Sequence, residues 1–420
     1  MSSLPSPEST LTVAESPASA AKCPVDHSAI SQQKTARHPE TSALPLECDA
    51  QGVWQVRGFD ESRAILRGTS TKQAGFNADQ VTSLQGMTNR PILYQEGKVH
   101  QQQRKQTARF FAPKTVSSDY RDFMETLADQ LINQLKQQKR ADLSKLSLEM
   151  AVAIASRVIG LSNSRMGGMS KRLDAFFEQE NPNITWQPLV KLLGLIKQRH
   201  MLSFFFLDVK PAIQARKGHP QEDVISHLLE HNYSDPEILT ECVTYAAAGM
   251  ATTREFISIA AWHFLEQPAL RDRYVAAQEE ERYEILHEML RLEPVVGHLF
   301  RYATADIALE SQGQQVVIPE GALIDLHIYA TNADQSVVGE DPMAICPGRA
   351  LTGDHIPAML MAFGDGHHRC PGAFLAIQES DIFLQRLLAL DGLSIERMPT
   401  LGWNEVASSY EVRDFVLALK

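Results

Sequence analysis

One ten-residue segment constrains this chain more than any other. It reads Phe363-Gly364-Asp365-Gly366-His367-His368-Arg369-Cys370-Pro371-Gly372, and a helical pattern follows from Ala373. Three glycines in ten residues permit backbone angles that other residues cannot adopt, and they free several N–H groups to point inward. These N–H groups and the N-terminus of the following helix favour the thiolate of Cys370, which is the form of cysteine that binds metal.

Three roles for Cys370 can be compared. An isolated cysteine usually packs as a small hydrophobic side chain, but packing alone does not require a glycine-rich loop. A zinc site built with His367 and His368 would need a fourth ligand from a distant segment. A single thiolate presented rigidly by a loop is instead a candidate axial ligand for haem iron, and we favour this third role.

The charge and the cysteines limit the partners and the compartment. Lys and Arg number 40 and Asp and Glu 51, so the net charge of −11 repels nucleic acid and anionic lipid. The five cysteines are far apart and lack a CxxC pair, which favours free thiols in a reducing compartment. No signal peptide and no run of 18 apolar residues is present, so we expect a soluble, cytoplasmic protein without a membrane span.

The chain divides into a tail and one large domain. Ser, Pro and Ala make up 21 of the first 44 residues and none is aromatic, so we expect a flexible tail over residues 1–44 and a folded domain over residues 45–420. The pattern predicts helices over 116–138, 145–160, 169–180, 184–208, 221–230, 235–266 and 281–292. Short strands are predicted near Val53–Val56 and over 307–309, 315–318 and 322–326, so the class is mainly α with small β-sheets.

At this point the chain resembles a known family. Residues Phe363 to Gly372 match FGxGxHxCxG, the haem-binding signature of the cytochrome P-450 (haem-thiolate) superfamily, and the resemblance extends over about residues 45–420. It implies the single-domain cytochrome P-450 fold of the soluble bacterial type, with long helices around a buried haem b (heme b, iron protoporphyrin IX). It also implies that Cys370 is the metal ligand and that Phe363, Gly364 and Gly372 contact the cofactor. We expect a monomer.

A second motif of the family is Glu288-Met289-Leu290-Arg291, which fits ExxR. The i,i+3 spacing places Glu288 and Arg291 on one helix face, where they can pair. In the family this pair locks with an arginine that precedes the haem loop, and Arg349 is the candidate here. Arg349 stands 14 positions before Phe363, which is a longer spacing than the family usually has.

Four side chains are expected to hold the haem propionates. His100 and Arg104 form HxxxR, and one helical turn would bring both to the same carboxylate. By the resemblance, Arg301 and His368 also occupy propionate-binding positions of the family. A buried acidic cofactor requires such neutralising groups.

By the same resemblance, the segment 246–253 is expected to lie in the helix that crosses the distal side of the haem. It resembles the family pattern [AG]Gx[DE]T[TS] inside a long helix, where Gly249 and a threonine bonding back to a carbonyl make a local opening plausible. Thr252 matches the threonine that helps to deliver protons, but Ala251 replaces the usual acid. Glu255, one helical turn from Thr252, could replace that acid with the help of Arg254. Water, a substrate carboxylate or a purely structural charge at Glu255 are the alternatives.

The resemblance implies an oxidoreductase, a haem-dependent, iron-containing monooxygenase that activates dioxygen and hydroxylates or epoxidises a small, mostly apolar organic molecule, either a natural product or a xenobiotic. No flavin or nicotinamide fingerprint is present, so a separate ferredoxin or flavodoxin with its reductase must supply electrons. Residues 97–118 contain Lys98, Arg104, Lys105, Arg109 and Lys114 without any acid, and we expect the electron donor to dock there.

Residues at family positions of the substrate pocket are mostly apolar or small. They are Phe76, Met87, Leu93, Ala247, Ala248, Val295, Val296, Leu299 and Tyr410. Two alternatives to the monooxygenase remain open. Because Ala251 replaces the acid, the same fold could reduce nitric oxide, use peroxide or catalyse oxidative coupling. The chain could also be a non-catalytic haem sensor or carrier.

Overall fold

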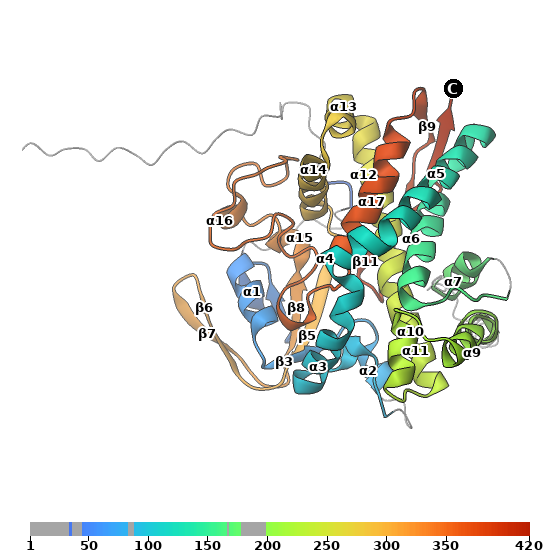
Figure 1. Ribbon diagram of the computed structural model, residues 1–420. Helices are drawn as coiled ribbons and strands as arrows, with labels where there is room; N and C mark the ends of the chain where they lie inside the picture. The colour runs from blue at the N-terminus through green and yellow to red at the C-terminus, as the bar shows by residue number, and fades with distance from the viewer. Residues whose placement is uncertain (1–32, 36–43, 83–87, 166–167, 178–198) are drawn as a thin grey trace, which may run out of the picture.

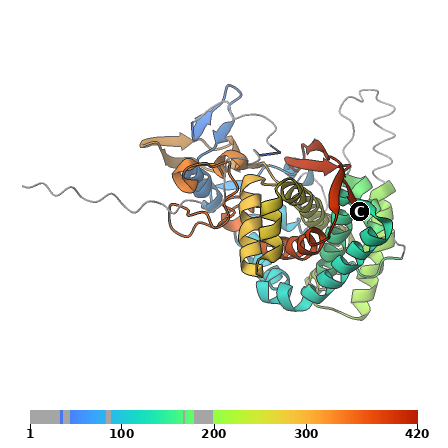
Figure 2. The same cartoon turned by 90° about the horizontal axis from the view of Figure 1, so that it is seen from above.

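The computed structural model describes residues 33–35, 44–82, 88–165, 168–177 and 199–420. Figure 1 shows long helices on one side of the molecule and the largest sheet on the other, and Figure 2 shows the same division from above. The helices of ten or more residues are α3 (Gly97–Thr107), α5 (Arg121–Gln138), α6 (Leu143–Ile159), α11 (Asp235–Ala246), α12 (Thr252–Glu266), α14 (Glu279–Leu292) and α17 (Ala373–Leu388).

Shorter helices and single helical turns connect these elements. The α-helices are α1 (Phe59–Arg67), α2 (Ala78–Thr82), α4 (Pro113–Thr115), α7 (Met169–Phe177), α9 (Lys210–Gly218), α10 (Val224–Glu230), α13 (Pro268–Ala276), α15 (Ile328–Thr331) and α16 (Gln335–Val338). The 3-10 turns are η2 (Ile92–Tyr94), η3 (Ala108–Phe111) and η7 (Gly366–His368), and the π-helical turns are η4 (Val116–Tyr120), η5 (Phe205–Val209) and η6 (Ala247–Ala251).

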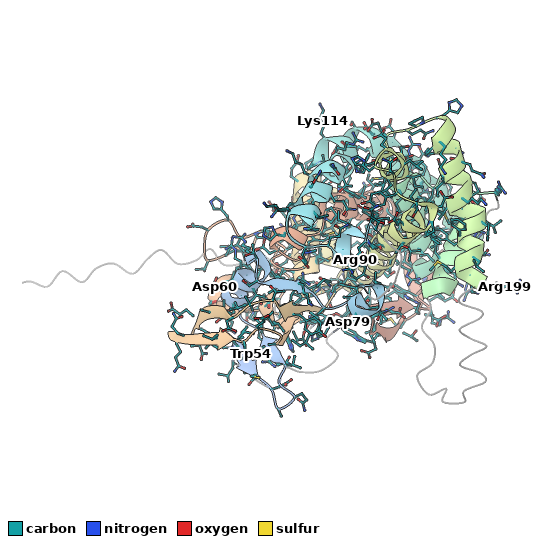
Figure 3. All side chains as sticks on the ribbon, turned by 90° about the horizontal axis from the view of Figure 1, so that it is seen from below. Trp54, Asp60, Asp79, Arg90, Lys114 and Arg199 are labelled. Atoms are coloured by element: carbon teal, nitrogen blue, oxygen red, sulfur yellow. The ribbon has the colours of Figure 1, made fainter. Side chains whose placement is uncertain are left out.

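The strands in the described part of the chain form four small sheets. The largest has the order β1-β2-β8-β5-β3, with β1 (Leu46–Cys48), β2 (Trp54–Val56), β3 (Thr71–Gln73), β5 (His298–Ala303) and β8 (Leu323–His327). Its β2–β8 pair is parallel and its other pairs are antiparallel. The remaining sheets are β6 (Ile307–Ser311) with β7 (Gln314–Ile318), β10 (Thr400–Asn404) with β11 (Ser409–Arg413), and β4 (Arg140–Asp142) with β12 (Val416–Leu419) and β9 (Leu393–Arg397). Trp54 marks the sheet side and Lys114 the helical side in Figure 3.

The helical core is built around α6 and α12. Of the 17 residues of α6, 13 are buried, so this helix is covered on nearly all sides. Its start is fixed by the carboxylate of Asp142, which accepts a hydrogen bond from the Ser144 N–H at 3.1 Å. The α12 helix packs against α6 and α17, and Figure 1 shows α12 and α17 running side by side through the centre. A second, smaller core lies between α1 and the sheet and contains Val56, Phe59 and Ile324.

Most predicted elements are confirmed. The predicted helix 235–266 is α11, η6 and α12 in continuous sequence, and its start has the capping box of Ser234 and Glu237. The predicted strands near 307, 315 and 322 are β6, β7 and β8. Parts of the predicted helices 169–180 and 184–208 lie outside the described residues. Within the described part of the chain, no helix is both long enough and apolar enough to span a bilayer.

The expected tail has a short described segment. Residues 1–32 and 36–43 lie outside the described residues, but Gln33, Lys34 and Thr35 contact the folded domain. The Lys34 N–H donates to the Glu293 carboxylate at 2.6 Å, and Thr35 is 5% exposed and donates to the same carboxylate through its N–H and its hydroxyl. These three residues are therefore packed against the domain, although composition alone assigned them to the tail.

The cysteines differ partly from the expectation of free thiols. Cys48, Cys242 and Cys370 are free, whereas Cys346 is disulfide-bonded. The expectation is therefore wrong for Cys346. Spacing along the sequence does not report which segments the fold brings together, and that is why it failed at this position.

Candidate functional site

The cysteine loop has the backbone that its glycines predicted. Gly364 and Gly366 have φ values of +67° and +65°, in the left-handed region that favours glycine. A Cβ on Gly366 would lie 2.0 Å from the backbone oxygen of Leu66, so the loop can pack against the end of α1 only because a side chain is absent there. The Asp365 side chain accepts from the Gly366 N–H at 2.7 Å and forms an ion pair with Arg67 at 2.8 Å, which ties the loop to α1.

Cys370 lies at the end of this loop, directly before α17. Its N–H donates to the Phe363 carbonyl at 2.9 Å, which closes the loop. Burial raises the pKa of the Cys370 thiol, whereas the Gly372 N–H and the nearby guanidinium groups of Arg104 and Arg369 favour the thiolate. A thiol with these neighbours is held in place and loses its proton when a metal ion binds the sulfur.

The expected propionate-binding residues come from three elements. The imidazole rings of His100 on α3 and His368 on η7 stack with their centroids 4.1 Å apart. Arg104, one turn beyond His100, donates to the Arg369 carbonyl beside Cys370. Burial, reinforced by the charges of His368 and Arg104, lowers the pKa of His100 to about 4. Burial, with a smaller contribution from these positive charges, therefore keeps the His100 imidazole neutral near pH 7.

Arg301 is the most buried member of this group. It lies on β5 with 4% of its surface exposed, and its guanidinium donates to the side-chain oxygen of Gln73 and to the Phe300 carbonyl. Among the described residues it has no ion pair with a carboxylate, and burial lowers its pKa to about 10. The charge of the nearby Glu96 carboxylate offsets part of this cost, and a further anion bound beside Arg301 would stabilise the buried cation.

These residues fit the iron porphyrin that the sequence resemblance implies. The cofactor needs one thiolate for its iron and cationic groups for two carboxylates. Cys370 is the thiol, and Arg104 and Arg301 are partly or fully buried guanidinium groups that form no direct ion pair with a carboxylate among the described residues. His100 and His368 complete the donor set. The donor chemistry of the site therefore matches the group.

Glu96 is a member of this site that sequence reasoning missed. It lies just before α3, accepts a hydrogen bond from His368 Nε2 at 2.9 Å, and also accepts from the Gln73 N–H at 2.8 Å. Burial opposes ionisation, but the hydrogen bond and charge of His368 still hold the pKa of Glu96 below its usual range. The sequence contained one indication of this role: Glu96 stands four residues before His100 and directly before the acid-free segment 97–118.

The distal helix opens where the sequence indicated. Between α11 and α12 the residues Ala247–Ala251 form the π-helical turn η6. The Thr252 hydroxyl donates to the Ala248 carbonyl at 2.6 Å. A π-turn combined with a back-bonding threonine widens the helix locally, and such turns often occur at functional sites.

Glu255 has a different environment from the one expected for a proton donor. It is 2% exposed, and its carboxylate accepts from Arg254 at 2.9 Å, from the Val412 N–H at 2.6 Å and from Arg413 at 2.7 Å. Both carboxylate oxygens are thus bonded to groups on α12 itself and on β11. The structure therefore makes Glu255 an anchor between these two elements and does not bring it to the Thr252 hydroxyl. The helical spacing of three residues could not reveal this.

A buried acid lies instead behind the distal helix. Glu379 on α17 is 3% exposed, shares a hydrogen bond with Thr253, and its Oε2 has no hydrogen-bond partner among the described residues. Burial raises the pKa of Glu379 well above its usual range, so its environment favours the protonated form of the carboxyl group. Sequence reasoning missed it because nothing in the local pattern of α17 marks this residue.

The Glu288, Arg291 and Arg349 side chains meet in the interior. Arg291 binds Glu288 through two hydrogen bonds of 2.7 and 2.8 Å, and Arg349 reaches the same carboxylate at 3.1 Å. Arg291 is 1% and Glu288 3% exposed. The unusual spacing of Arg349 from the cysteine loop does not prevent this contact. The three residues connect α14 to the segment that leads into the loop.

The expected pocket residues lie on several elements. Ala247 and Ala248 belong to η6, Leu93 to η2, and Val296 forms a bridge with Ser409. Met87 lies outside the described residues. The side chain of Leu299 approaches Gly364 of the cysteine loop, so this residue borders the site.

Two of the expected pocket residues are core residues. Tyr410 is 1% exposed, and its hydroxyl donates to the Glu293 carbonyl at 3.3 Å, while Val295 is 5% exposed. Two cavities are lined by other residues, one beside Glu96 and one beside Phe76. One of about 800 Å³ is lined in part by Tyr94, Glu96 and Val99, and one of about 270 Å³ is lined in part by Phe76. Asp79 and Arg90, which also line the larger cavity, are labelled in Figure 3.

The chain is similar in sequence to known cytochrome P450 proteins. The family profile described as Cytochrome P450 matches residues 283–390. The chain is 26% identical over 359 residues to the biotin biosynthesis cytochrome P450 of Bacillus subtilis (strain 168), covering 83% of this chain and 84% of that one. It is 26% identical over 365 residues to the erythromycin C-12 hydroxylase of Saccharopolyspora erythraea, covering 84% and 86%.

Solved structures share the fold. A mutant of P450 EryK in complex with erythromycin B superposes with a TM-score of 0.69 at 22% identity, covering 89% of this chain and 93% of that one. P450BioI in complex with an acyl carrier protein ligated to hexadec-9Z-enoic acid gives a TM-score of 0.70 at 22% identity, covering 90% and 95%.

Proposed function

Because the chain belongs to the cytochrome P450 superfamily and is a haem-dependent oxidoreductase, we propose that it hydroxylates or epoxidises a mostly apolar small organic molecule. Electrons come from a separate redox protein. The observation that carries this proposal is the placement of Cys370 directly before α17, near buried guanidinium groups that form no direct ion pair with a carboxylate among the described residues. Bound haem supplies the activation of dioxygen, and the protein supplies the thiolate, the anion-binding groups and the proton path.

The proximal residues fix the position and charge of the cofactor. Cys370 provides the ligand atom, and its thiolate is stabilised by the Gly372 N–H. Arg301 and Arg104 neutralise the two cofactor carboxylates, and His100 and His368 donate hydrogen bonds to them. Arg301 is fixed by Gln73, so its guanidinium cannot turn toward solvent.

On the distal side, Thr252 holds a proton at its hydroxyl. The bond to the Ala248 carbonyl orients this hydroxyl, and the π-turn leaves room for water beside it. Because Ala251 carries no acid, the proton must come from another group. We assign this role to Glu379, because its burial favours the protonated carboxyl group and because it is hydrogen-bonded to Thr253, the neighbour of Thr252.

The assignment of the proton source can be tested with two matched variants. Glu379→Gln keeps the shape of the side chain and removes the acid, so it should divert reducing equivalents from product to hydrogen peroxide. Glu255→Gln should instead lower the midpoint of thermal unfolding and leave the ratio of product to peroxide per haem unchanged. Uncoupling in Glu255→Gln with normal coupling in Glu379→Gln would reverse the assignment.

Electron donors are proposed to dock on a basic surface formed by Lys98, Lys105, Arg109 and Lys114. All four side chains are exposed in the structure, and they lie on α3, η3 and α4. Arg109 is near Glu222 at 3.8 Å, which is a weak, solvated contact. An acidic ferredoxin or flavodoxin would be steered to this surface by complementary charge.

This docking surface predicts a specific kinetic effect. Lys105→Glu combined with Arg109→Glu should slow reduction by an acidic ferredoxin at least tenfold at low salt and leave substrate binding unchanged. As a control, Lys72→Glu changes an exposed lysine on β3, outside this surface. Equal reduction rates in the two variants would contradict the docking proposal.

The substrate is proposed to be a medium-sized or large, mostly apolar molecule. Leu299 borders the cysteine loop, and Ala247 and Ala248 are the small side chains of the distal turn. The experiment is a screen for the spin-state shift of the haem, followed by product analysis with a surrogate redox partner. Dioxygen uptake without any oxygenated product from compounds that shift the spin state would contradict the monooxygenase proposal.

A second candidate function rests on Ala251. A P450 without the distal acid could reduce nitric oxide, use peroxide as its oxidant or couple two substrates. Rates with NADH plus nitric oxide and rates with peroxide alone separate these activities from the first proposal. A non-catalytic haem sensor would show neither a substrate-induced spin shift nor dioxygen consumption.

A further inference from the structure

Three metal-ligating side chains meet on two strands of the largest sheet, and one of these strands, β5, also carries Arg301 of the haem site. The three side chains are His298 on β5 and Asp325 and His327 on β8. Their ligand atoms lie within 4.8 Å of one another. We propose that these three residues form a binding site for a divalent transition-metal ion of the zinc type, separate from the haem iron.

Strand geometry fixes the three side chains on one face. Asp325 and His327 are two residues apart, so they point to the same side of β8. His298 is paired directly with His327 in the antiparallel register. Alternation also places Leu299 and Arg301, which serve the haem site, on the opposite face of β5. The two sites therefore share a strand without sharing a side chain.

The distances suit a single ion. His298 Nδ1 lies 2.9 Å from Asp325 Oδ1, and His327 Nε2 lies 3.6 Å from Asp325 Oδ2. Zinc binds imidazole and carboxylate at about 2.0–2.2 Å, so two of its ligand atoms are about 2.9 Å apart at a right angle and about 3.4 Å apart at the tetrahedral angle. His327 Nε2 also contacts the Gln55 side-chain oxygen at 2.5 Å, so binding of one ion by all three ligand atoms requires release of this contact and small rotations of the side chains.

The charge of the cluster also points to a cation. Asp325 is 8% exposed, and among the described residues its ion-pair partners are the two imidazoles, with no lysine or arginine. A buried carboxylate that lacks a fixed positive charge is stabilised when a divalent ion binds. The His298 side chain is 27% exposed, so water can reach the site and complete the coordination. Two imidazoles, one carboxylate and an open position form a set that zinc uses in proteins.

A second trio serves as the matched control. His227, Glu230 and His231 also place their ligand atoms within 4.8 Å of one another, but they lie on or just after the seven-residue helix α10. His231 Nδ1 is already engaged with the His227 carbonyl at 2.8 Å. We expect this trio to bind zinc weakly, and because His231 is exposed, His231→Gln is a control for loss of an exposed histidine.

The test is a zinc titration of the haem-loaded protein with a competing zinc indicator. Wild type and His231→Gln should bind one tightly held zinc ion per chain, and His298→Gln should bind zinc at least tenfold more weakly at equal haem content. Equal affinity in His298→Gln and wild type, or no stoichiometric zinc in wild type, would overturn the proposal.

A second measurement needs no variant and so does not depend on whether His298→Gln folds. Zinc K-edge X-ray absorption of the zinc-loaded wild type should show two imidazoles with oxygen ligands and no sulfur. A shell containing sulfur would place the ion at a cysteine and would overturn the assignment.

Discussion

Glu288→Gln removes the carboxylate that two buried arginines share. Arg291, at 1% exposure, and Arg349 both lie within 3.1 Å of this carboxylate, and Glu288 also accepts from the Cys346 N–H at 3.0 Å. Glutamine has nearly the same shape but no charge. The substitution therefore leaves two guanidinium groups in the interior without their counter-charge.

The structure sets the size of the expected effect. Breaking a buried ion pair by removing one partner costs about 3–5 kcal/mol, since the remaining charge stays desolvated. For a domain of this length the entropy of unfolding is roughly 0.8 kcal/mol per degree, so the midpoint of thermal unfolding should fall by about 4–6 °C. The decrease in the unfolding midpoint should be the same in apoprotein and in haem-loaded protein, because the three residues are not expected to contact the cofactor.

Thermal unfolding followed by far-UV circular dichroism measures this effect. Glu396→Gln is the matched control, because Glu396 pairs with Arg140 at 2.8 Å but both side chains are about half exposed. An exposed pair contributes about 0–1 kcal/mol, so the control should shift the midpoint by about 1 °C or less. Equal shifts in the two variants would refute the view that the Glu288 pair is a buried structural lock.

Three further predictions concern the loop, the cofactor and pH. Gly366→Ala places a Cβ 2.0 Å from a backbone oxygen, so it should reduce haem incorporation severalfold, measured by haem absorbance per chain. Gly313 also has a positive φ but has open space where a Cβ would be, so Gly313→Ala should leave haem incorporation unchanged. Arg301→Gln removes a charged donor worth about 1.5–3 kcal/mol, so haem transfer to apomyoglobin should speed up roughly ten- to 150-fold, and an unchanged rate would refute its role. Burial lowers the pKa of His287 from 6.5 to about 4, so between these pH values the unfolded chain binds one more proton than the folded chain. The free energy of unfolding should therefore decrease as the pH falls through this range. His287→Gln should weaken this pH dependence, measured by urea unfolding.

The sequence predicted those parts of the fold that depend on local pattern. The helical run 235–266 was predicted from its pattern, and the structure has the same boundaries, with a capping box at Ser234. The opening near Gly249 followed from residue types that weaken a helix, and it is the π-turn η6. The glycines of the cysteine loop predicted its backbone because positive φ is a property of single residues.

Contacts between distant segments were harder to predict. Glu255 has suitable helical spacing from Thr252, but β11 supplies its partners from more than 150 residues away. Tyr410 was expected to line the pocket, and a hydrogen bond to the Glu293 carbonyl places it in the core. Glu96 was missed for the same reason, since His368 reaches it only in the folded chain. Periodicity shows which face of an element is apolar, and it does not show which other segment packs there.

The most direct test of the central claim is the absorption spectrum of the reduced protein with carbon monoxide. Wild type and Cys48→Ala, which changes an exposed free thiol, should both show the strongly red-shifted Soret band of thiolate-ligated haem. Cys370→Ala should lose this band completely. A Cys370→Ala protein that retains the red-shifted band would contradict the assignment of Cys370 as the haem ligand, and with it the function proposed for this chain.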